Sequence, residues 1–287
     1  MQADMLIGLW SGLDRCDGCK DPLFADAGAP PPARPFRAPA KGAVLFVGEA
    51  PPKTGGFWIE RSGDAVRRLL LPALPSWPGD VDWDSKEAID WFVGRGYLFI
   101  QAMKWTLIGQ SYLKLGAEEG KAALRHAVER HLLTEIGLIA PSAIVALGTA
   151  AWRAAALIAE SYGRALEDNG VSSARLRHHE LPRPGGDMIP LHATFLPGTI
   201  NDGLARSRMD AMRDDVRVFL RCVAGEKCES FSPSVQAPQK KRDPGFHKWW
   251  KDARARLKAA GLYPLPEGMT FEAAMHELDR RERRGPA

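Results

Sequence analysis

Short apolar runs alternate with amphipathic segments along most of the chain. The runs are continuous, which is typical of strands that are covered on both faces of a parallel sheet. They predict strands at residues 43–47, 96–103, 142–147 and 191–196. Apolar residues at helical spacing predict helices at residues 62–74, 85–93 and 124–139, from residue 149 onward, and at 209–219. Since strands alternate with helices, we expect an α/β fold: three αβα layers around a central, mostly parallel four-stranded sheet.

Both ends of the chain differ from this core in composition. Residues 1–39 combine a short helix, a Cys-x-x-Cys turn and a connector rich in proline and alanine. We predict the α/β domain at 40–222, a linker at 223–245 and a basic helical extension at 246–287. The formal net charge is +4, and residues 239–287 alone hold 12 Lys and Arg against 7 Asp and Glu. This tail is predicted to attract DNA phosphates non-specifically, and the alternative is a helical pair that only packs on the core.

Four cysteines form two close pairs, Cys16/Cys19 and Cys222/Cys228. No run approaches the roughly 20 apolar residues of a membrane-spanning helix, so we expect a cytoplasmic protein without a membrane partner. In a reducing cytosol such pairs favour a metal or cluster over disulfides. The four cysteines could form one structural site for zinc or an iron–sulfur cluster. The alternative is that they are free thiols that bind no metal. The sequence indicates no particular protein partner.

Residues 41–58 form the segment with the strongest sign of chemistry. They read KGAVLFVGEAPPKTGGFW, so that Glu49 directly follows a buried strand and its terminal glycine. Two prolines and two glycines then make a loop of unusual composition. Open α/β sheets bind their ligands at the carboxyl ends of strands, which makes this a predicted ligand loop. An ordinary strand-to-helix turn is the alternative.

Five segments carry motifs in a consistent order. They read V-G-E-A-P at 47–51, W-I-E-R-S-G at 58–63, Q-A-M-K at 101–104, A-L-G-T-A-A at 146–151 and A-T-F-L-P at 193–197. Four of them resemble the G-E-A-P, F-V-G-R-A-G, N-V-V-K and A-T-Y-H-P motifs of the uracil-DNA glycosylase superfamily, in particular its iron–sulfur, thermophile-type branch. The remaining segment, A-L-G-T-A-A at 146–151, resembles a strand end of that branch that contains alanine and glycine. The resemblance covers residues 43–221.

The resemblance implies a pocket for a base that is swung out of DNA. Trp58, with Phe57 beside it, would stack on the base where the branch has a phenylalanine; core packing is the alternative for Trp58. Gln101 would read the base edge in place of an asparagine, because its amide offers two donors and an acceptor. Contacts to the DNA are predicted for an aliphatic wedge and three basic side chains, namely Ile200, Lys104, Arg206 and Arg208.

Catalysis is predicted to need no cofactor and to depend on Glu49. Its carboxylate could position the attacking water, or alternatively accept hydrogen bonds from loop amides. Leu196 stands where the branch has a histidine that stabilises the leaving base. Asn201 and Asp202 are the next candidates, and one of them could replace that histidine, although N-D-G is also an ordinary turn sequence.

We therefore predict a DNA glycosylase, a hydrolase of N-glycosidic bonds that flips out a nucleotide and leaves an abasic site. The departures at Gln101 and Leu196 favour a modified pyrimidine over uracil, such as a hydroxymethylated or glucosylated base of phage DNA, and a role in antiviral defence. The alternatives are a repair glycosylase for uracil or deaminated bases and a catalytically inactive DNA-binding member. A generic nucleotide-binding enzyme is disfavoured because no G-x-G-x-x-G or G-x-x-x-x-G-K-[ST] motif is present. The sequence departs from the branch at two further positions. Trp105 and Val128 stand where the branch has the third and fourth cysteines that bind its iron–sulfur cluster.

Overall fold

The fold was obtained as a computed structural model. It describes residues 2–21, 23, 25, 26, 28, 29, 35, 42–53, 56–108, 112, 115–166, 170–183, 186–197, 203–226, 255–261, 274, 277 and 278. The chain divides into two compact units, Met1–Val235 and Gln236–Ala287. In the second unit residues 255–259 are helical, and the described apolar side chains of Leu257, Ala274 and Leu278 are buried.

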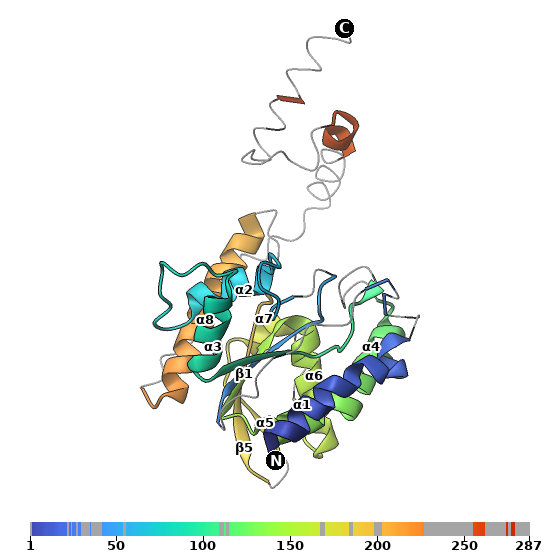
Figure 1. The fold of residues 1–287 in the computed structure, drawn as a ribbon, viewed down its shortest axis with the longest axis vertical. Helices are drawn as coiled ribbons and strands as arrows, with labels where there is room; N and C mark the ends of the chain where they lie inside the picture. The colour runs from blue at the N-terminus through green and yellow to red at the C-terminus, as the bar shows by residue number, and fades with distance from the viewer. Residues whose placement is uncertain are drawn as a thin grey trace. The chain divides into compact units, whose positions relative to one another are not determined.

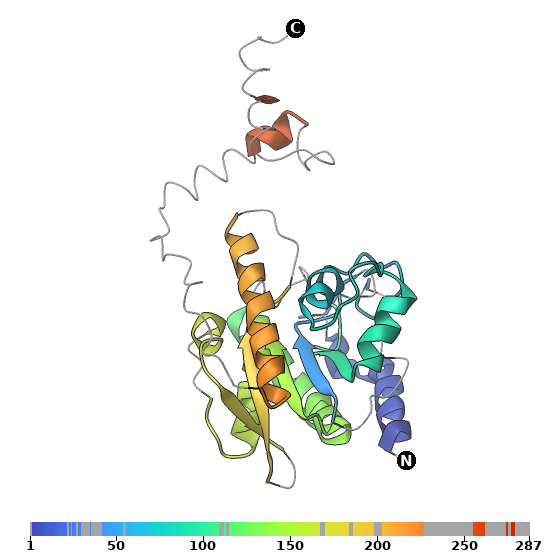
Figure 2. The same cartoon turned by 90° about the vertical axis from the view of Figure 1, so that its left-hand side faces the viewer.

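A five-stranded sheet forms the centre of the described part of the first unit (Figures 1 and 2). Its strands are β1 (Val44–Gly48), β2 (Tyr97–Gln101), β3 (Ala143–Leu147), β4 (His179–Pro182) and β5 (Met188–Thr194). They lie in the order β2-β1-β3-β5-β4, and all neighbours are parallel except β4 and β5. The predicted α/β fold with a mostly parallel sheet is confirmed.

β4 is the difference from the predicted four-stranded sheet. It pairs antiparallel with β5 at the edge of the sheet, where His179 lies opposite Leu191. Its residues read H-E-L-P, so it contains no apolar run from which a strand could have been predicted. An edge strand tolerates polar residues and a proline because one side of its backbone has no partner strand.

Helices cover both faces of the sheet. They are α1 (Gln2–Gly12), α2 (Ala65–Leu70), α3 (Lys86–Gly94), α4 (Ala117–Ala127), α5 (Leu133–Ile139), α6 (Gly148–Ser161), α7 (Val171–Ala174) and α8 (Gly203–Val223). Short 3₁₀ turns in the described residues include η1 (Leu13–Arg15), η2 (Asp17–Lys20) and η3 (Leu71–Ala73), and the π-helical segment η6 (Val128–Leu132) joins α4 to α5. α3 and α8 lie on one face of the sheet and α6 on the other, with α1 and α4 outside α6 (Figure 1). None of the described helices is both long and apolar enough to cross a lipid bilayer.

Local sequence explains where several of these helices begin. The carboxylate of Asp64 caps α2 by accepting the backbone N–H of Arg67 at 2.7 Å, and the Ser85 hydroxyl caps α3 by accepting that of Ala88 at 3.2 Å. α6 is rich in alanine, and its small buried side chains let the helix approach β1 and β3 closely. The sheet and its covering helices therefore form a rigid support for the loops at the carboxyl ends of the strands.

Candidate functional site

The carboxyl ends of four parallel strands meet at one edge of the sheet. Gly48 at the end of β1 lies in register with Gln101 at the end of β2, and Leu147 of β3 with Thr194 of β5. The chain runs from β1 outward to β2 and then returns to β3 on the other side of β1. Such a reversal of strand order is where open α/β sheets bind ligands. The segment after β1 therefore begins at the expected place for a site.

Glu49 is the first residue beyond β1 and is half-buried. Its carboxylate Oε1 accepts a short hydrogen bond from the backbone N–H of Tyr112, a residue 63 positions further along the chain. Its own carbonyl accepts the N–H of Met103 at 2.8 Å, and the carbonyl of Gly48 accepts that of Ala102 at 2.9 Å. The segments after β1 and β2 are thus joined by main-chain bonds. One carboxylate oxygen caps a loop amide, which leaves the other oxygen as the one a reacting water could contact.

Two glycines at this edge allow unusually close contacts. A Cβ on Gly48 would lie 2.6 Å from the ring of Phe99, and a Cβ on Gly148 would lie 2.7 Å from the Leu196 Cβ. Gly148 also has φ of +87°, a conformation that side chains other than glycine rarely adopt. Leu196 therefore packs directly against the turn between β3 and α6. Its apolar side chain stands at the sheet edge where the resemblance implies a histidine.

The two aromatic residues predicted to contact the base are buried. Phe57 is 1% exposed and stacks on Phe99 with 4.6 Å between ring centroids and 19° between ring planes. Trp58 is 7% exposed, and its indole N–H donates to the carbonyl of Phe99 at 3.1 Å. Both rings also contact Phe92 of α3. This geometry agrees with the packing alternative for Trp58, because its ring faces the core.

Arg67 holds this aromatic segment in place, a role for which the sequence offered no signal beyond a cation in an apolar helix. Its guanidinium is fully buried and donates to the carbonyls of Phe57 at 2.8 Å and Ile59 at 3.0 Å. It also forms an ion pair with Asp84. Burial lowers the pKa of Arg67 and raises that of Asp64, the nearby cap of α2. The backbone of residues 57–59 is thus tied to a buried charge.

Gln101 is the last residue of β2, and Lys104 follows the strand. The side-chain amide of Gln101 is half-buried and makes no hydrogen bond within the part of the chain that the structure describes. The backbone carbonyl of Gln101 accepts a hydrogen bond from the ammonium of Lys104 at 2.6 Å, and that ammonium is buried in an ion pair with Glu135. Glu135 also accepts the indole N–H of Trp10 at 3.0 Å. Lys104 is therefore engaged inside the protein, and we do not retain it among the proposed DNA contacts.

The remaining predicted site residues lie toward the start of α8. Ile200, Asn201 and Asp202 are outside the described residues, as is the side chain of Arg206. Arg208 is exposed, and its guanidinium lies 5.5 Å from the ring centroid of Phe195, just beyond β5. The guanidinium of Arg175 lies beside the same ring, at 5.6 Å. Arg208 is thus the one predicted DNA contact whose exposed position the structure describes.

A buried ion pair supports the end of β5. Arg175 donates two hydrogen bonds to Asp215 of α8, each at 2.8 Å, and the hydroxyl of Thr194 donates to the same carboxylate at 2.7 Å. Burial raises the pKa of Asp215, while Arg175 and Thr194 oppose that shift. His192 lies two residues before Thr194 in β5 and is fully buried against Phe219. Burial lowers the pKa of His192 to about 3. It is a neutral core residue.

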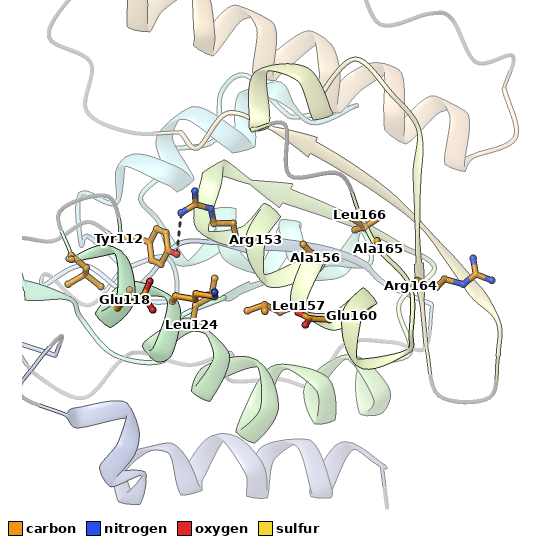
Figure 3. Close-up of a pocket in the computed structure, with 14 residues that line it drawn as sticks. Tyr112, Glu118, Leu124, Arg153, Ala156, Leu157, Glu160, Arg164, Ala165 and Leu166 are labelled. Carbon is orange, nitrogen blue, oxygen red and sulfur yellow. Dashed lines mark hydrogen bonds between the residues drawn. The ribbon is translucent and has the colours of Figure 1, made fainter.

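A cavity of about 580 Å³ lies between α4 and α6 (Figure 3). Tyr112 lines it, and Arg153 lies 5.7 Å from the centroid of the tyrosine ring and donates to its hydroxyl at 3.4 Å. Leucines and alanines form half of the remaining wall, and its charged residues are Glu118, Lys121, Glu160 and Arg164. Tyr112 connects the cavity to the sheet edge because its backbone N–H binds Glu49. Neither Gln101 nor Trp58 lines it, so it is separate from the predicted base contacts.

The cysteine prediction is corrected by the structure. Cys16 and Cys19 are free thiols that lie beside one histidine of α4 and one of η6, and this group of four could hold a metal ion: Cys16, Cys19, His126 and His131. Cys222, in contrast, is disulfide-bonded, and Cys228 lies outside the described residues. The prediction that Cys222 binds a metal is therefore wrong, and the prediction for Cys228 stays untested. The spacings C-x₂-C and H-x₄-H are those of zinc sites, and this signal was missed because the pairs are far apart in sequence.

Comparisons with known proteins agree with this geometry. The comparison with curated proteins found no match. The family described as the Uracil DNA glycosylase superfamily matches residues 35–254, a range that contains all five motifs and the whole sheet edge. Because this match covers well over half of its length, the chain belongs to the uracil DNA glycosylase superfamily.

Proposed function

We propose that the protein hydrolyses the N-glycosidic bond of a modified pyrimidine in DNA, leaves an abasic site and acts in defence against phages that carry such bases. Membership of the superfamily implies a DNA glycosylase in general, and the choice of base is the proposal. The observation that carries it is Leu196, which packs against Gly148 where the related branch has a histidine. Leucine cannot donate a hydrogen bond to a departing uracil anion, so the site is poorly suited to uracil itself.

In the proposed reaction, the bond between C1′ and the base nitrogen breaks and a water oxygen bonds to C1′. The electron pair of the broken bond leaves with the base, and the proton lost by the water is finally taken up by the base. The sugar becomes positively charged in the transition state. The Glu49 carboxylate would stabilise that charge and orient the water, and its hydrogen bond from Tyr112 supports this role by holding it in one orientation.

Gln101 is the proposed reader of the base edge. Its side chain lies at the end of β2 next to Gly48 in register, and its amide makes no hydrogen bond to another described residue. An amide at such a position can donate to and accept from a base without first breaking a protein contact. It also reaches one carbon further than asparagine, which suits a base whose substituent displaces the ring.

The direct test is mass spectrometry of the free bases released from a panel of DNAs. The panel comprises unmodified DNA, uracil-containing DNA, and phage DNAs with hydroxymethylcytosine or its glucosylated form, and abasic sites are counted in parallel. We expect release from a modified DNA and none from uracil DNA. Release of uracil alone would support the repair alternative. Binding without release from any DNA would support the inactive DNA-binding alternative, which the position of Leu196 also favours. For the defence role, a phage with modified bases should plate less efficiently than the same phage without them.

Replacing Gln101 with alanine should lower kcat/KM on the true substrate by roughly 10-fold or more, because one or two hydrogen bonds to the base disappear. The stability should hardly change, since no described residue depends on that amide. Kinetics and a thermal melt on the same preparation check both statements. An unchanged kcat/KM would remove Gln101 from the proposed site.

Deleting residues 239–287 should weaken binding to all DNA sequences alike. This segment carries 12 Lys and Arg against 7 Asp and Glu, and basic side chains that neutralise phosphates release counterions. The slope of log K against log salt should therefore become less steep by about 0.9 for each phosphate that the tail neutralises. Fluorescence anisotropy at several salt concentrations measures it. A deletion variant with the slope of the full chain would leave only a packing role for the tail.

A further inference from the structure

We propose that the N-terminal turn and the helix formed by α4, η6 and α5 together hold a single structural zinc ion, with the ligands Cys16, Cys19, His126 and His131. The resemblance to the thermophile-type branch implies an iron–sulfur cluster held by four cysteines. The donor set in this chain is different, so the inference concerns which metal this chain holds and by which residues.

The four donor atoms are arranged around one point. They all lie within 4.8 Å of one another. The His126 Nε2 lies 3.3 Å from the sulfur of Cys16, and the His131 Nε2 lies 3.1 Å from each of the two sulfurs. In a tetrahedral site with Zn–S of about 2.3 Å and Zn–N of about 2.0 Å, sulfur and nitrogen ligands are about 3.5 Å apart. The observed group is therefore about the size of one zinc tetrahedron.

An iron–sulfur cluster does not fit the same residues. A cluster needs room for several irons and sulfides between its ligands, and donors within 4.8 Å of one another leave room for one ion. The positions that the resemblance aligns with the missing cysteines are nevertheless near this site. Lys20, next to Cys19, lies 5.0 Å from the centroid of the Trp105 ring, and Val128 begins the π-helical segment that contains His131. The proposed zinc site thus lies where the resemblance implies the iron–sulfur cluster, but different residues provide the ligands.

The π-helical segment explains how both histidines face the cysteines. In a regular α-helix, residues five apart lie about 140° apart around the axis, so His126 and His131 would point in different directions. After His126 the helix continues into Val128–Leu132, which contains His131 and whose hydrogen bonds run from residue i to i+5; this adds a residue to the turn and reduces that angle. The two imidazole centroids are 6.3 Å apart as a result. Such segments cost stability in a helix and frequently occur at functional sites.

Gly18 supports the same conclusion from the cysteine side. A Cβ at this position would lie 2.3 Å from Cε1 and 2.5 Å from Nε2 of His126. The turn between Cys16 and Cys19 is closed by the N–H of Cys19, which donates to the carbonyl of Cys16 at 3.1 Å. Only glycine lets this turn approach the imidazole so closely. The sequence C-D-G-C therefore provides both sulfurs and the space for a histidine between them.

Charge and coordination number indicate a structural role. Two thiolates and two neutral imidazoles around Zn²⁺ make a neutral unit, which suits the buried positions of Cys19 and His131. Four protein ligands leave no open position for water or substrate, so the ion takes no part in the reaction. Its effect is to join the segment after α1 to the α4–α5 helix, whose Glu135 accepts the indole N–H of Trp10.

The first test is the metal content of the full-length protein, expressed with both zinc and iron available. We expect about one zinc and almost no iron per chain, no visible absorption of an iron–sulfur cluster, and a lower Tm after chelation. Replacement of zinc by cobalt should give the visible spectrum of a tetrahedral site with thiolate ligands. Iron with cluster absorption, a chain that neither contains nor takes up zinc, or a Cys16–Cys19 disulfide would each overturn the proposal.

Matched variants then identify the ligands. Cys19→Ser and His131→Asn should reduce zinc from about one per chain to almost none. Cys222→Ser and His178→Asn should retain it, because Cys222 and the exposed His178 are not in the donor group. Gly18→Ala keeps every ligand and should still weaken zinc retention against a competing chelator, because its Cβ displaces His126. Loss of zinc in Cys222→Ser, or its retention in both ligand variants, would contradict the assignment. If a ligand variant fails to fold, the metal content and cobalt spectrum of the unaltered protein still decide the question.

Discussion

Glu49→Gln should reduce the rate of base release by about 10²-fold or more while leaving DNA binding almost intact. The amide keeps an oxygen that can accept the N–H of Tyr112, so the loop after β1 keeps its shape. What disappears is the negative charge that stabilises the positively charged sugar in the transition state. Because that charge develops only as the bond breaks, the loss should fall on kcat rather than on binding. Single-turnover release of the free base and a separate binding measurement distinguish the two.

Glu60→Gln is the matched control for this experiment. Glu60 lies in the neighbouring segment and is exposed, and its ion pair with Arg61 is long, at 3.9 Å. Its replacement removes the same charge from the protein without touching the sheet edge, and it should release bases at the unaltered rate. If Glu49→Gln were as fast as the unaltered protein on the true substrate, Glu49 would be a structural acceptor of the Tyr112 amide. The catalytic assignment would then move to Asp202.

Arg67→Met should lower the free energy of unfolding by about 3 kcal/mol or more. The substitution removes the ion pair with Asp84 and takes the donor from the buried carbonyl of Phe57 and the partly buried carbonyl of Ile59. Methionine fills most of the volume, so the loss measures the polar contacts rather than a cavity. In a domain of this size, the change corresponds to a fall in Tm of roughly 10 °C. Denaturant unfolding and a thermal melt measure it.

Arg68→Met provides the comparison, because Arg68 is the next residue of α2 and is exposed. Its replacement changes net charge and helix composition in the same way and should alter stability by no more than about 0.5 kcal/mol. Equal losses of stability in the two variants would show that the buried guanidinium is not what holds residues 57–59. A larger loss in Arg67→Met alone would identify it as the support of the aromatic segment.

The local sequence pattern was sufficient to predict which residues lie at the carboxyl ends of the strands. It was not sufficient to predict which side chains surround each of these residues. Continuous apolar runs that end in glycine or polar residues mark the ends of buried strands, and those ends determine where Glu49 and Gln101 lie. Lys104 and Trp58 are different, because their sequence neighbours do not reveal their partners. Lys104 pairs with Glu135 and Trp58 donates to Phe99, contacts that depend on how distant segments pack. The position of a cation or an aromatic residue next to a strand end therefore does not predict how exposed its side chain is.

The sequence by itself determined the α/β class, the parallel strands, the loop that begins at Glu49 and the superfamily. The physical reason is that strand and helix periodicity, glycine turns and short motifs are local properties of the chain. Only the tertiary structure decided that β4 joins the sheet, that Arg67 supports the aromatic segment, and that Cys16 and Cys19 face His126 and His131 rather than Cys222. These contacts follow from the packing of separate elements, and the cysteines meet the histidines because a π-helical segment turns both imidazoles toward the N-terminal turn.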